Sequence, residues 1–175
     1  SALHFSGDLC KGLGTAMASE GAAAVTYSAN VAYDVDRGLW LRKNTTEQAA
    51  LGNHFLNTLV GIVSSGNNPG KSNLNGNGIV DTARSTAATV ATCFNESGDG
   101  IAVIGEQKSV VAKNSIAGSA RSAVELLTDT ASLDVQLNQA TGSKQYDLED
   151  RGMLNHVEKN RCQTSSPTGL CTAAP

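Results

Sequence analysis

The longest uninterrupted pattern in this sequence runs from Gln107 to Gln139 and contains no proline. Its apolar residues recur mostly three, four or seven positions apart, which is the spacing of one stripe along an α-helix. These residues are Val110, Val111, Ala117, Ala120, Val124, Leu127, Ala131, Val135 and Leu137. The pattern predicts a long amphipathic helix on which the other segments pack.

The composition of the chain also favours helices. Aromatic residues make up only 4% of it, so alanine, valine, leucine and glycine must fill the core. Small side chains let helices approach closely, whereas β-sandwich strands are richer in aromatic and β-branched residues. Shorter helical patterns cover residues 8–42, 46–63, 81–93 and 144–160, and no internal repeat is evident. We therefore expect one mostly α domain over residues 1–175, a disulfide-stapled helical bundle built on a long antiparallel helix pair.

Cysteine usage indicates an oxidising compartment. The four cysteines are Cys10, Cys93, Cys162 and Cys171, and none of them has metal-type CxxC spacing. The last two enclose Pro167 and Gly169, a turn-forming loop that a local disulfide could close, which leaves the first two to pair with each other. An even set of this kind is typical of secreted or periplasmic proteins, so we predict an extracytoplasmic location. No apolar run approaches the ~20 residues that a membrane-spanning helix needs.

Two loops have part of the pattern of a ligand-binding motif. Residues 65–72 have the rhythm of a phosphate-binding loop, but Ser65 replaces its first glycine and the following residues cannot begin the required helix. Residues 73–81 alternate side-chain oxygens as a calcium loop does, but three ligands are neutral asparagines and the closing position is Arg84. The first is interpreted as a plain loop, and calcium is kept only as a remote alternative. No cofactor or metal is predicted.

No set of side chains suggests a reaction. The histidines, His4, His54 and His156, are not at metal-ligand spacing, and His54 is expected inside a helix near its core face. The clustered carboxylates are assigned to solvated helix faces; they are Asp34, Asp36, Asp147, Glu149 and Asp150. No Gly-x-Ser-x-Gly elbow occurs. The sequence therefore predicts no catalytic residue and a protein that is not an enzyme.

Two further features leave alternatives open. Trp40 is the sole tryptophan, and it either anchors a helix end or contacts a partner at the surface. Asn44 and Asn95 begin glycosylation sequons, which matter only in a eukaryotic source.

The end of the chain resembles a known pattern. The segment from Leu154 to Cys162, followed by Gly169-Leu-Cys171-Thr-Ala-Ala-Pro, is similar to a pattern in some bacterial type IV secretion and conjugation proteins. These carry a helix that ends in a cysteine, then a short polar Pro/Gly loop, then a Gly-Leu-Cys-like element. The resemblance covers about the last twenty residues. It implies an exported, helical, envelope-located component of a pilus-related transfer apparatus that works by protein contact.

The functional expectation combines these observations. A net charge of −3 and a pI near 5.5 give no reason to expect nucleic acid or an anionic membrane surface as a partner. We predict a non-enzymatic structural or interaction protein of the bacterial cell envelope, whose partners are other proteins of an envelope or surface assembly. An extracellular surface-coat or receptor domain, or a component of a virus or phage particle, remains an alternative.

Overall fold

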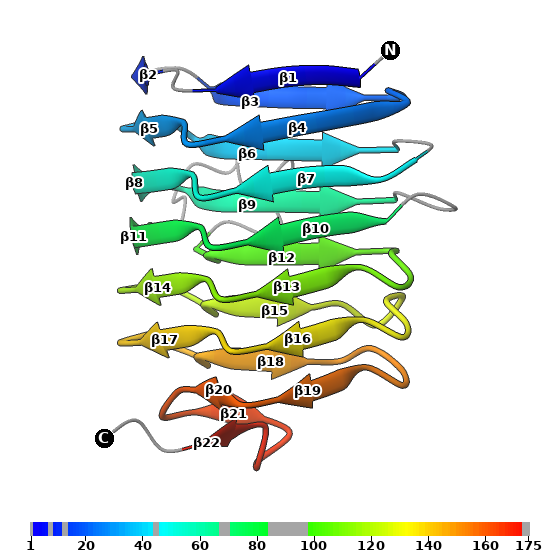
Figure 1. Ribbon diagram of the computed structural model, residues 1–175. Coiled ribbons are helices and arrows are strands. Elements are labelled where there is room, and N and C mark those ends of the chain that lie inside the picture. The colour runs from blue at the N-terminus through cyan, green and yellow to red at the C-terminus, as the bar shows by residue number, and fades with distance from the viewer. Residues whose placement is uncertain are drawn as a thin grey trace.

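The computed structural model describes residues 2–6, 9–11, 14–43, 46–66, 71–83 and 98–172. Among these residues there is no helix, and successive strands join three parallel sheets in turn. Figure 1 shows strands of two sheets as stacked layers of arrows pointing in opposite directions, with the chain ends at opposite ends of the stack. The fold is a parallel β-solenoid. The expected mostly α helical bundle, with its long antiparallel helix pair, is therefore wrong.

We name the sheets A, B and C in the order in which each coil visits them. Sheet A contains β1 (Ala2–Ser6), β4 (Ala24–Ser28), β7 (Gln48–Leu51), β10 (Ser72–Asn75), β13 (Val110–Ala112), β16 (Asp134–Gln136) and β19 (His156–Glu158). Sheet B contains β2 (Leu9–Lys11), β5 (Val31–Tyr33), β8 (His54–Thr58), β11 (Gly78–Thr82), β14 (Ser115–Ala117), β17 (Gln139–Thr141), β20 (Asn160–Arg161) and β22 (Cys171–Thr172). Sheet C contains β3 (Thr15–Glu20), β6 (Arg37–Arg42), β9 (Val60–Ser65), β12 (Ile101–Ile104), β15 (Val124–Leu126), β18 (Leu148–Asp150) and β21 (Ser165–Ser166).

A ladder of buried asparagines forms the corner between sheets A and B. Each side-chain amide donates to the carbonyl oxygen of the next asparagine along the solenoid at 2.9–3.0 Å. The ladder consists of Asn30, Asn53, Asn77, Asn114, Asn138 and Asn160. Its members are 23, 24, 37, 24 and 22 residues apart. The chain therefore has an internal repeat, contrary to the expectation of none.

The residue before each ladder asparagine turns the corner. All six have a left-handed backbone with φ between 54° and 68°: Ala29, Gly52, Gly76, Lys113, Leu137 and Lys159. Glycine adopts this conformation without strain, whereas the other residues do not, so the buried amide bonds must hold them there. Because these bonds repeat in every coil, the corner is fixed at the same place each time.

Side chains inside the solenoid stack on their counterparts in the next coil. In sheet B, Phe55 pairs with Ile79 and Ile79 with Ile116, and all three are buried. Beside this column a glycine makes room, because a Cβ on Gly61 would lie 2.6 Å from the carbonyl oxygen of Gly100 and 2.8 Å from Ile79 Cδ1. The core is thus narrow and closely packed, which explains how so few aromatic residues fill it.

A buried carboxylate occupies the corner between sheets C and A. Glu106 is fully buried and accepts hydrogen bonds from the hydroxyls of Ser64, Ser72 and Ser109. The hydroxyl of Ser109 in turn accepts the backbone N–H of Ser72 at 2.9 Å. These contacts join residues from coils that are far apart in sequence, so the polar cluster fastens the coils to one another.

The C-terminal end of the solenoid is closed by a disulfide-bonded loop. Cys162 and Cys171 are joined, with their Cα atoms 5.2 Å apart, which is the pairing that the Pro/Gly loop predicts. Leu170 and Cys171 pack against the hydrophobic core, and β22 pairs with β20. The loop therefore caps the last coil, as the end of a repeat array requires. The expected Cys10–Cys93 pairing lies outside the described side chains.

The predicted helices are instead strands and corners. Residues 8–42 contain β2 to β6, residues 46–63 contain β7, β8 and most of β9, and residues 144–160 contain β18 and β19. Of residues 81–93, the described part is the end of β11 and Ala83, and the rest lies outside the described residues. Gln107–Gln139, expected as one helix, contains β13 to β16 and starts β17. Its helical spacing arose because short strands and corners place apolar residues at intervals that average near three or four.

Candidate functional site

Two cavities lie side by side at the corner between sheets B and C. The larger has a volume of about 730 Å³ and is lined by Thr82, Ala83, Gly118, Ala120, Lys144 and Gln145. The smaller, of about 450 Å³, is lined by Tyr146, Cys162, Gln163, Thr164, Ser165, Thr168, Gly169 and Cys171. Their linings meet at the consecutive residues Gln145 and Tyr146. Together they extend past the ends of four successive sheet B strands, β11, β14, β17 and β20.

The backbone stacks this corner in register. The amide of Ala120 donates to the carbonyl of Thr82 at 3.1 Å, and the amide of Lys144 donates to the carbonyl of Ser119 at 3.0 Å. Each coil thus places its corner residues directly over those of the previous coil. Because neighbouring strands of a sheet lie about 4.8 Å apart, the corner offers a regular series of polar positions.

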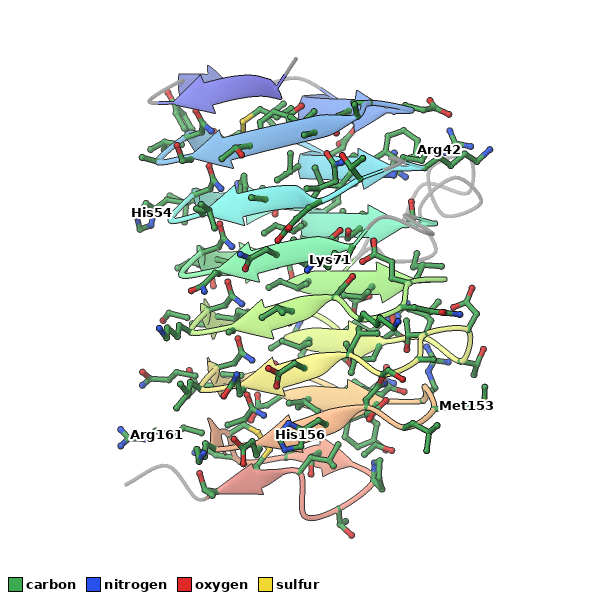
Figure 2. The ribbon with its side chains drawn as sticks, turned by 45° about the vertical axis from the view of Figure 1, so that its right-hand side comes forward. Arg42, His54, Lys71, Met153, His156 and Arg161 are labelled. Atoms are coloured by element: carbon green, nitrogen blue, oxygen red, sulfur yellow. A yellow bond between two sulfur atoms is a disulfide. The ribbon has the colours of Figure 1, made fainter. Side chains whose placement is uncertain are left out.

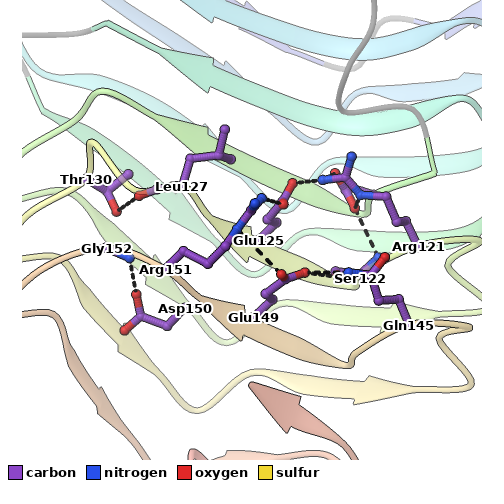
Figure 3. Close-up of polar contacts among 11 residues, drawn as sticks. Arg121, Ser122, Glu125, Leu127, Thr130, Gln145, Glu149, Asp150, Arg151 and Gly152 are labelled. Carbon is purple, nitrogen blue, oxygen red and sulfur yellow. Dashed lines mark hydrogen bonds and ion pairs between the residues drawn. The ribbon is translucent and has the colours of Figure 1, made fainter. Parts of the chain in front are cut away.

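A charge cluster lies on sheet C (Figure 3), and Gln145, which lines the larger cavity, is hydrogen-bonded to it. Glu125 and Glu149 occupy paired positions in β15 and β18. Glu125 forms ion pairs with both Arg121 and Arg151, and its side chain is only 1% exposed. Glu149 lies 3.5 Å from Arg151 and accepts a hydrogen bond of 2.9 Å from the hydroxyl of Ser122. Like charges on adjacent coils are therefore held together by shared arginines.

Asp99 completes the charge cluster, which we define as Asp99, Arg121, Glu125, Glu149 and Arg151. Asp99 is fully buried, pairs with Arg121 at 2.9 Å and accepts the backbone N–H of Ser122 at 3.0 Å. Burial raises the pKa of Asp99 to about 7, against the lowering effect of the Arg121 guanidinium and the Ser122 amide. All three carboxylates of the cluster are thus bound by arginine or by hydrogen-bond donors.

Gln145 connects this cluster to the larger cavity. Its side-chain amide donates to Oε2 of Glu149 at 3.1 Å, and the residue is exposed. In the described part of the chain no donor bonds to the carbonyl oxygen of the Gln145 side chain. Glu149 therefore orients an amide whose oxygen can accept a hydrogen bond from a ligand.

Asp147 holds the wall of the smaller cavity. It is buried, and its carboxylate accepts the backbone N–H groups of Ser143 at 3.2 Å, Gln163 at 2.9 Å and Thr164 at 3.2 Å. These bonds fasten the start of the disulfide-bonded loop to the segment that carries Tyr146. The tyrosine ring is consequently one side of a cavity whose other side is supplied by the loop.

The described linings of both cavities share one chemical character. They carry hydroxyl and amide groups, one aromatic ring and one ammonium group, and none of the residues named above as lining is an aspartate or glutamate. Hydroxyl and amide groups both donate and accept hydrogen bonds, and an aromatic face packs against apolar ring surfaces. This set suits a ligand with many hydroxyl groups.

A second surface feature is an apolar stripe on the outer face of sheet B. We define the sheet B stripe as Tyr33, Leu56, Val80 and Ala117, which pair in register from strand to strand. Leu56 is 49% exposed and Val80 42% exposed. Aligned exposed apolar residues differ from the scattered ones that are normal on a surface.

The structure places His54 and His156 on the surface. His54 is exposed on sheet B, so its expected position near a helical core face is wrong. His156 is exposed on sheet A, 3.4 Å from Asp134 and 3.7 Å from Glu158 (Figure 2). The side chain of His4 lies outside the described part. Among the described residues no group of histidine, cysteine, aspartate and glutamate has the geometry of a metal site.

Of the expected solvated carboxylates, Asp34 is exposed and Asp36 and Asp150 are partly buried, but none lies on a helix. Asp147 and Glu149 are buried, so that prediction is wrong for them. Sequence reasoning missed their roles because partners such as Glu125 and Thr164 come from neighbouring coils.

Both motif-like segments include residues of strands in the solenoid. Ser65 ends β9 and Ser72 begins β10, so a strand and not a helix follows the phosphate-loop-like segment. Residues 73–81 run from β10 into β11, and Asn77 belongs to the asparagine ladder. Arg84, Asn44 and Asn95 lie outside the described residues. Trp40 is partly buried, and the guanidinium carbons of Arg37 and Arg42 lie 4.3 and 5.0 Å from its ring centre.

Neither protein-family models, nor curated proteins, nor solved structures give a match to this chain. None of the described residues belongs to a helix that could cross a membrane.

Proposed function

We propose that this protein is a non-enzymatic, extracytoplasmic binding protein that holds a segment of polysaccharide along the corner between sheets B and C. The observation that carries the proposal is the pair of adjacent cavities lined by hydroxyl, amide and aromatic groups across four coils. A solenoid repeats its corner at a constant interval, and a polysaccharide repeats its sugar units. A match between two regular arrays would let one chain make the same kind of contact several times.

The charge cluster supports binding over catalysis. A general acid or base must reach its substrate. The side chains of Asp99 and Glu125 are 0% and 1% exposed, and both are occupied by arginine. In this proposal the charge cluster instead holds the side chain of Gln145 in place through Glu149.

Disulfide bonding supports the extracytoplasmic location, because disulfides such as Cys162–Cys171 persist in oxidising compartments. Membership of a type IV secretion apparatus remains a separate prediction. The residues before Cys162 form β19 and β20, so the helical element of that resemblance is wrong.

Affinity gel electrophoresis against soluble neutral and acidic polysaccharides tests the binding proposal. At least one polysaccharide should retard the protein. Tyr146→Ala and Gln145→Ala should each reduce the retardation, and Gln139→Ala, an exposed glutamine on sheet B, should leave it unchanged. Absence of retardation by every polysaccharide would overturn the proposal. New reducing ends on a retained polysaccharide would overturn its non-enzymatic part.

The sheet B stripe supports a second candidate function, docking of a protein of an envelope or surface assembly. Asp34 and Asp81 are exposed beside the stripe, at the ends of β5 and β11. Charge complementarity therefore favours a partner with an apolar strip flanked by lysine or arginine.

Photo-crosslinkers placed at positions 56 and 80 test this second function. Both should capture the same protein in native extracts, and that protein, once purified, should bind directly with an affinity that falls as salt rises. Leu56→Lys should abolish binding and Gln139→Lys should preserve it. Dimerisation of this chain through the stripe, or equal loss with both variants, would contradict the docking function.

A further inference from the structure

The disulfide-bonded loop forms part of the wall of the smaller cavity. Both of its cysteines, Cys162 and Cys171, line that cavity together with Tyr146. The strands that flank or belong to the loop, β20, β21 and β22, lie together at the C-terminal end of the stack (Figure 1). The disulfide therefore fixes the loop beside the aromatic ring that the proposed function uses to bind a polysaccharide.

The first half of the loop is held by contacts other than the disulfide. The carboxylate of Asp147 accepts the backbone N–H groups of Gln163 at 2.9 Å and Thr164 at 3.2 Å. The backbone N–H of Asp147 in turn donates to the hydroxyl of Thr164 at 2.9 Å, and β21 then pairs with β18. Hydrogen bonds to a carboxylate are roughly twice as strong as those between neutral groups. This half should therefore keep its position when the disulfide is cut.

The second half of the loop has weaker contacts. The backbone N–H of Leu170 donates to the hydroxyl of Ser165 at 3.3 Å, and that of Cys162 donates to the carbonyl of Thr172 at 3.3 Å. Both distances exceed the ~2.7–3.2 Å of ordinary N–H···O hydrogen bonds. β22 is a strand of two residues, and the hydroxyl of Thr172 bonds to the carbonyl of Asn160 at 2.9 Å. The disulfide is consequently the strongest link between this half and the rest of the solenoid.

The two cysteines differ in their access to solvent. Cys162 is 2% exposed and belongs to the hydrophobic core, whereas Cys171 is partly exposed. The cavity beside them has a volume of about 450 Å³, which admits a small thiol. Thiol–disulfide exchange requires access of the attacking thiolate to a sulfur atom. Cys171 is therefore the sulfur that a reductant attacks.

We propose that the Cys162–Cys171 disulfide is a redox switch that controls polysaccharide binding in the smaller cavity. This inference rests on the proposed function. A thiolate of a dithiol attacks Sγ of Cys171 and forms a mixed disulfide with it, while Cys162 leaves as a thiolate. The second thiol of the reductant then displaces Cys171. The protein thus gains two electrons and two protons, and the dithiol becomes a disulfide. The second half of the loop then leaves the cavity, and Tyr146 loses the wall that keeps a sugar ring against it.

Affinity gel electrophoresis with and without dithiothreitol tests the switch, using a polysaccharide that retards the oxidised protein. Reduction should raise the apparent Kd by about twofold to tenfold, the range for one lost aromatic contact, and reoxidation should restore binding. The double variant, Cys162→Ser with Cys171→Ser, should bind like the reduced protein and should not respond to dithiothreitol. Because this variant keeps Cys10 and Cys93, it also shows whether those two cysteines contribute to the response.

Two further variants separate an effect at the cavity from a general loss of stability. Tyr146→Ala already lacks the aromatic contact, so dithiothreitol should change its apparent Kd little. Gln145→Ala is the matched control, because Gln145 lines the larger cavity, and it should keep the full response to dithiothreitol. An equal response of the two variants would mean that reduction does not act through the ring of Tyr146, which would overturn the switch.

Hydrogen exchange of the protein without polysaccharide measures the release of the loop independently. Reduction should accelerate exchange at the amides of Cys162 and Leu170 and leave those of Gln163 and Thr164 protected. Unchanged binding after complete reduction, a disulfide that dithiothreitol cannot reduce in the folded protein, or equal acceleration at all of these amides would overturn the switch and leave polysaccharide binding in place. Failure of every polysaccharide to bind the oxidised protein would overturn the proposed function and the switch with it.

Discussion

Asn77 donates its side-chain amide to Oδ1 of Asn114 at 3.0 Å, although 37 residues separate them in sequence. The same oxygen accepts the backbone N–H of Asn77 at 2.9 Å. Asn114 in turn donates to the carbonyl of Leu74 and to Oδ1 of Asn138, both at 2.9 Å. This pair joins the coils at the point where the repeat is longest. The continuity of the ladder therefore depends on it.

Asn114→Ala should destabilise the protein by about 2–4 kcal/mol. The change removes a buried acceptor and leaves the donors of Asn77 unsatisfied, and each such loss costs about 1–3 kcal/mol. Urea unfolding followed by circular dichroism measures the difference. Gln139→Ala, at an exposed position on sheet B, should change the stability by less than about 0.5 kcal/mol. A loss below about 1 kcal/mol for Asn114→Ala would show that the ladder contributes little.

The asparagine spacing was the sequence signal for this fold. Each ladder asparagine recurs after 22–24 residues, apart from the 37-residue interval that contains residues 84–97. A search for a repeat of constant length fails at that interval. The helices were predicted instead from apolar residues only three or four positions apart. Gly52-Asn53 and Gly76-Asn77 also mark the corner directly, since glycine is favoured where φ is positive.

The apolar pattern of Gln107–Gln139 predicted a helix wrongly, and the reason is physical. Val124 and Leu126, at the two ends of a three-residue strand, both point into the core, and so do Leu133 and Val135. The helical stripe included Val124 and Val135 but missed Leu126 and Leu133. In their place it selected Leu127 and Leu137, which lie at corners and are more exposed. Strands this short give too few alternations to outweigh a chance match to helical spacing.

Only parts of the candidate site could be read from the sequence. The Pro/Gly loop between Cys162 and Cys171 predicts its disulfide, and the loop then forms part of a cavity. The charge cluster could not be predicted, because Glu125 and Arg151 meet only when β15 and β18 are aligned. Register between coils is a property of the whole solenoid and is not encoded in a local motif.

Gly61→Ala should destabilise by about 1–3 kcal/mol or more through overpacking. The added Cβ would lie 2.6 Å from a backbone oxygen that the stacked coils hold in place. Gly14→Ala is the control, because its Cβ would meet only Asp36 at 3.7 Å. Thermal unfolding of the two variants measures the contrast. Equal melting temperatures would mean that the coils can shift apart at Gly61.

Arg121→Met should destabilise by about 3–5 kcal/mol, because it leaves the buried carboxylates of Asp99 and Glu125 without a shared cation. Lys71→Met removes an exposed pair with Glu47 at 3.8 Å and should cost at most about 1 kcal/mol. Urea unfolding of both variants measures the two losses of stability. A similar small loss for the two would show that the charge cluster is not important for stability.

Asp99 should make the stability depend on pH. Burial raises the pKa of this group in the folded protein to about 7, above its ordinary value of 3.8, so the folded state binds the proton more tightly. Its contribution is fully present below pH 3.8 and is lost as the pH rises towards 7 and above. Asp99→Asn keeps the acceptor for Ser122 and removes the charge. Relative to the unchanged protein, the variant should therefore gain stability as the pH rises from about 4 to about 7, by up to ~1.4 kcal/mol per pH unit, and the difference should level off above pH 7. If the plots of stability against pH run parallel for the two proteins, the raised pKa of Asp99 would be contradicted.

Replacing both members of the C-terminal disulfide, Cys162→Ser with Cys171→Ser, should destabilise by about 2–3 kcal/mol, the range expected for closing so short a loop. The loss should be local at first, since Leu170 and Cys171 cover the end of the core. Hydrogen exchange should accelerate most at the amides of β20 and β22, whereas the amides of β7 and β10 near the middle of the solenoid should keep their protection. Uniform acceleration in all coils would instead mean that the solenoid unfolds as one unit and that the loop does not act as an end cap.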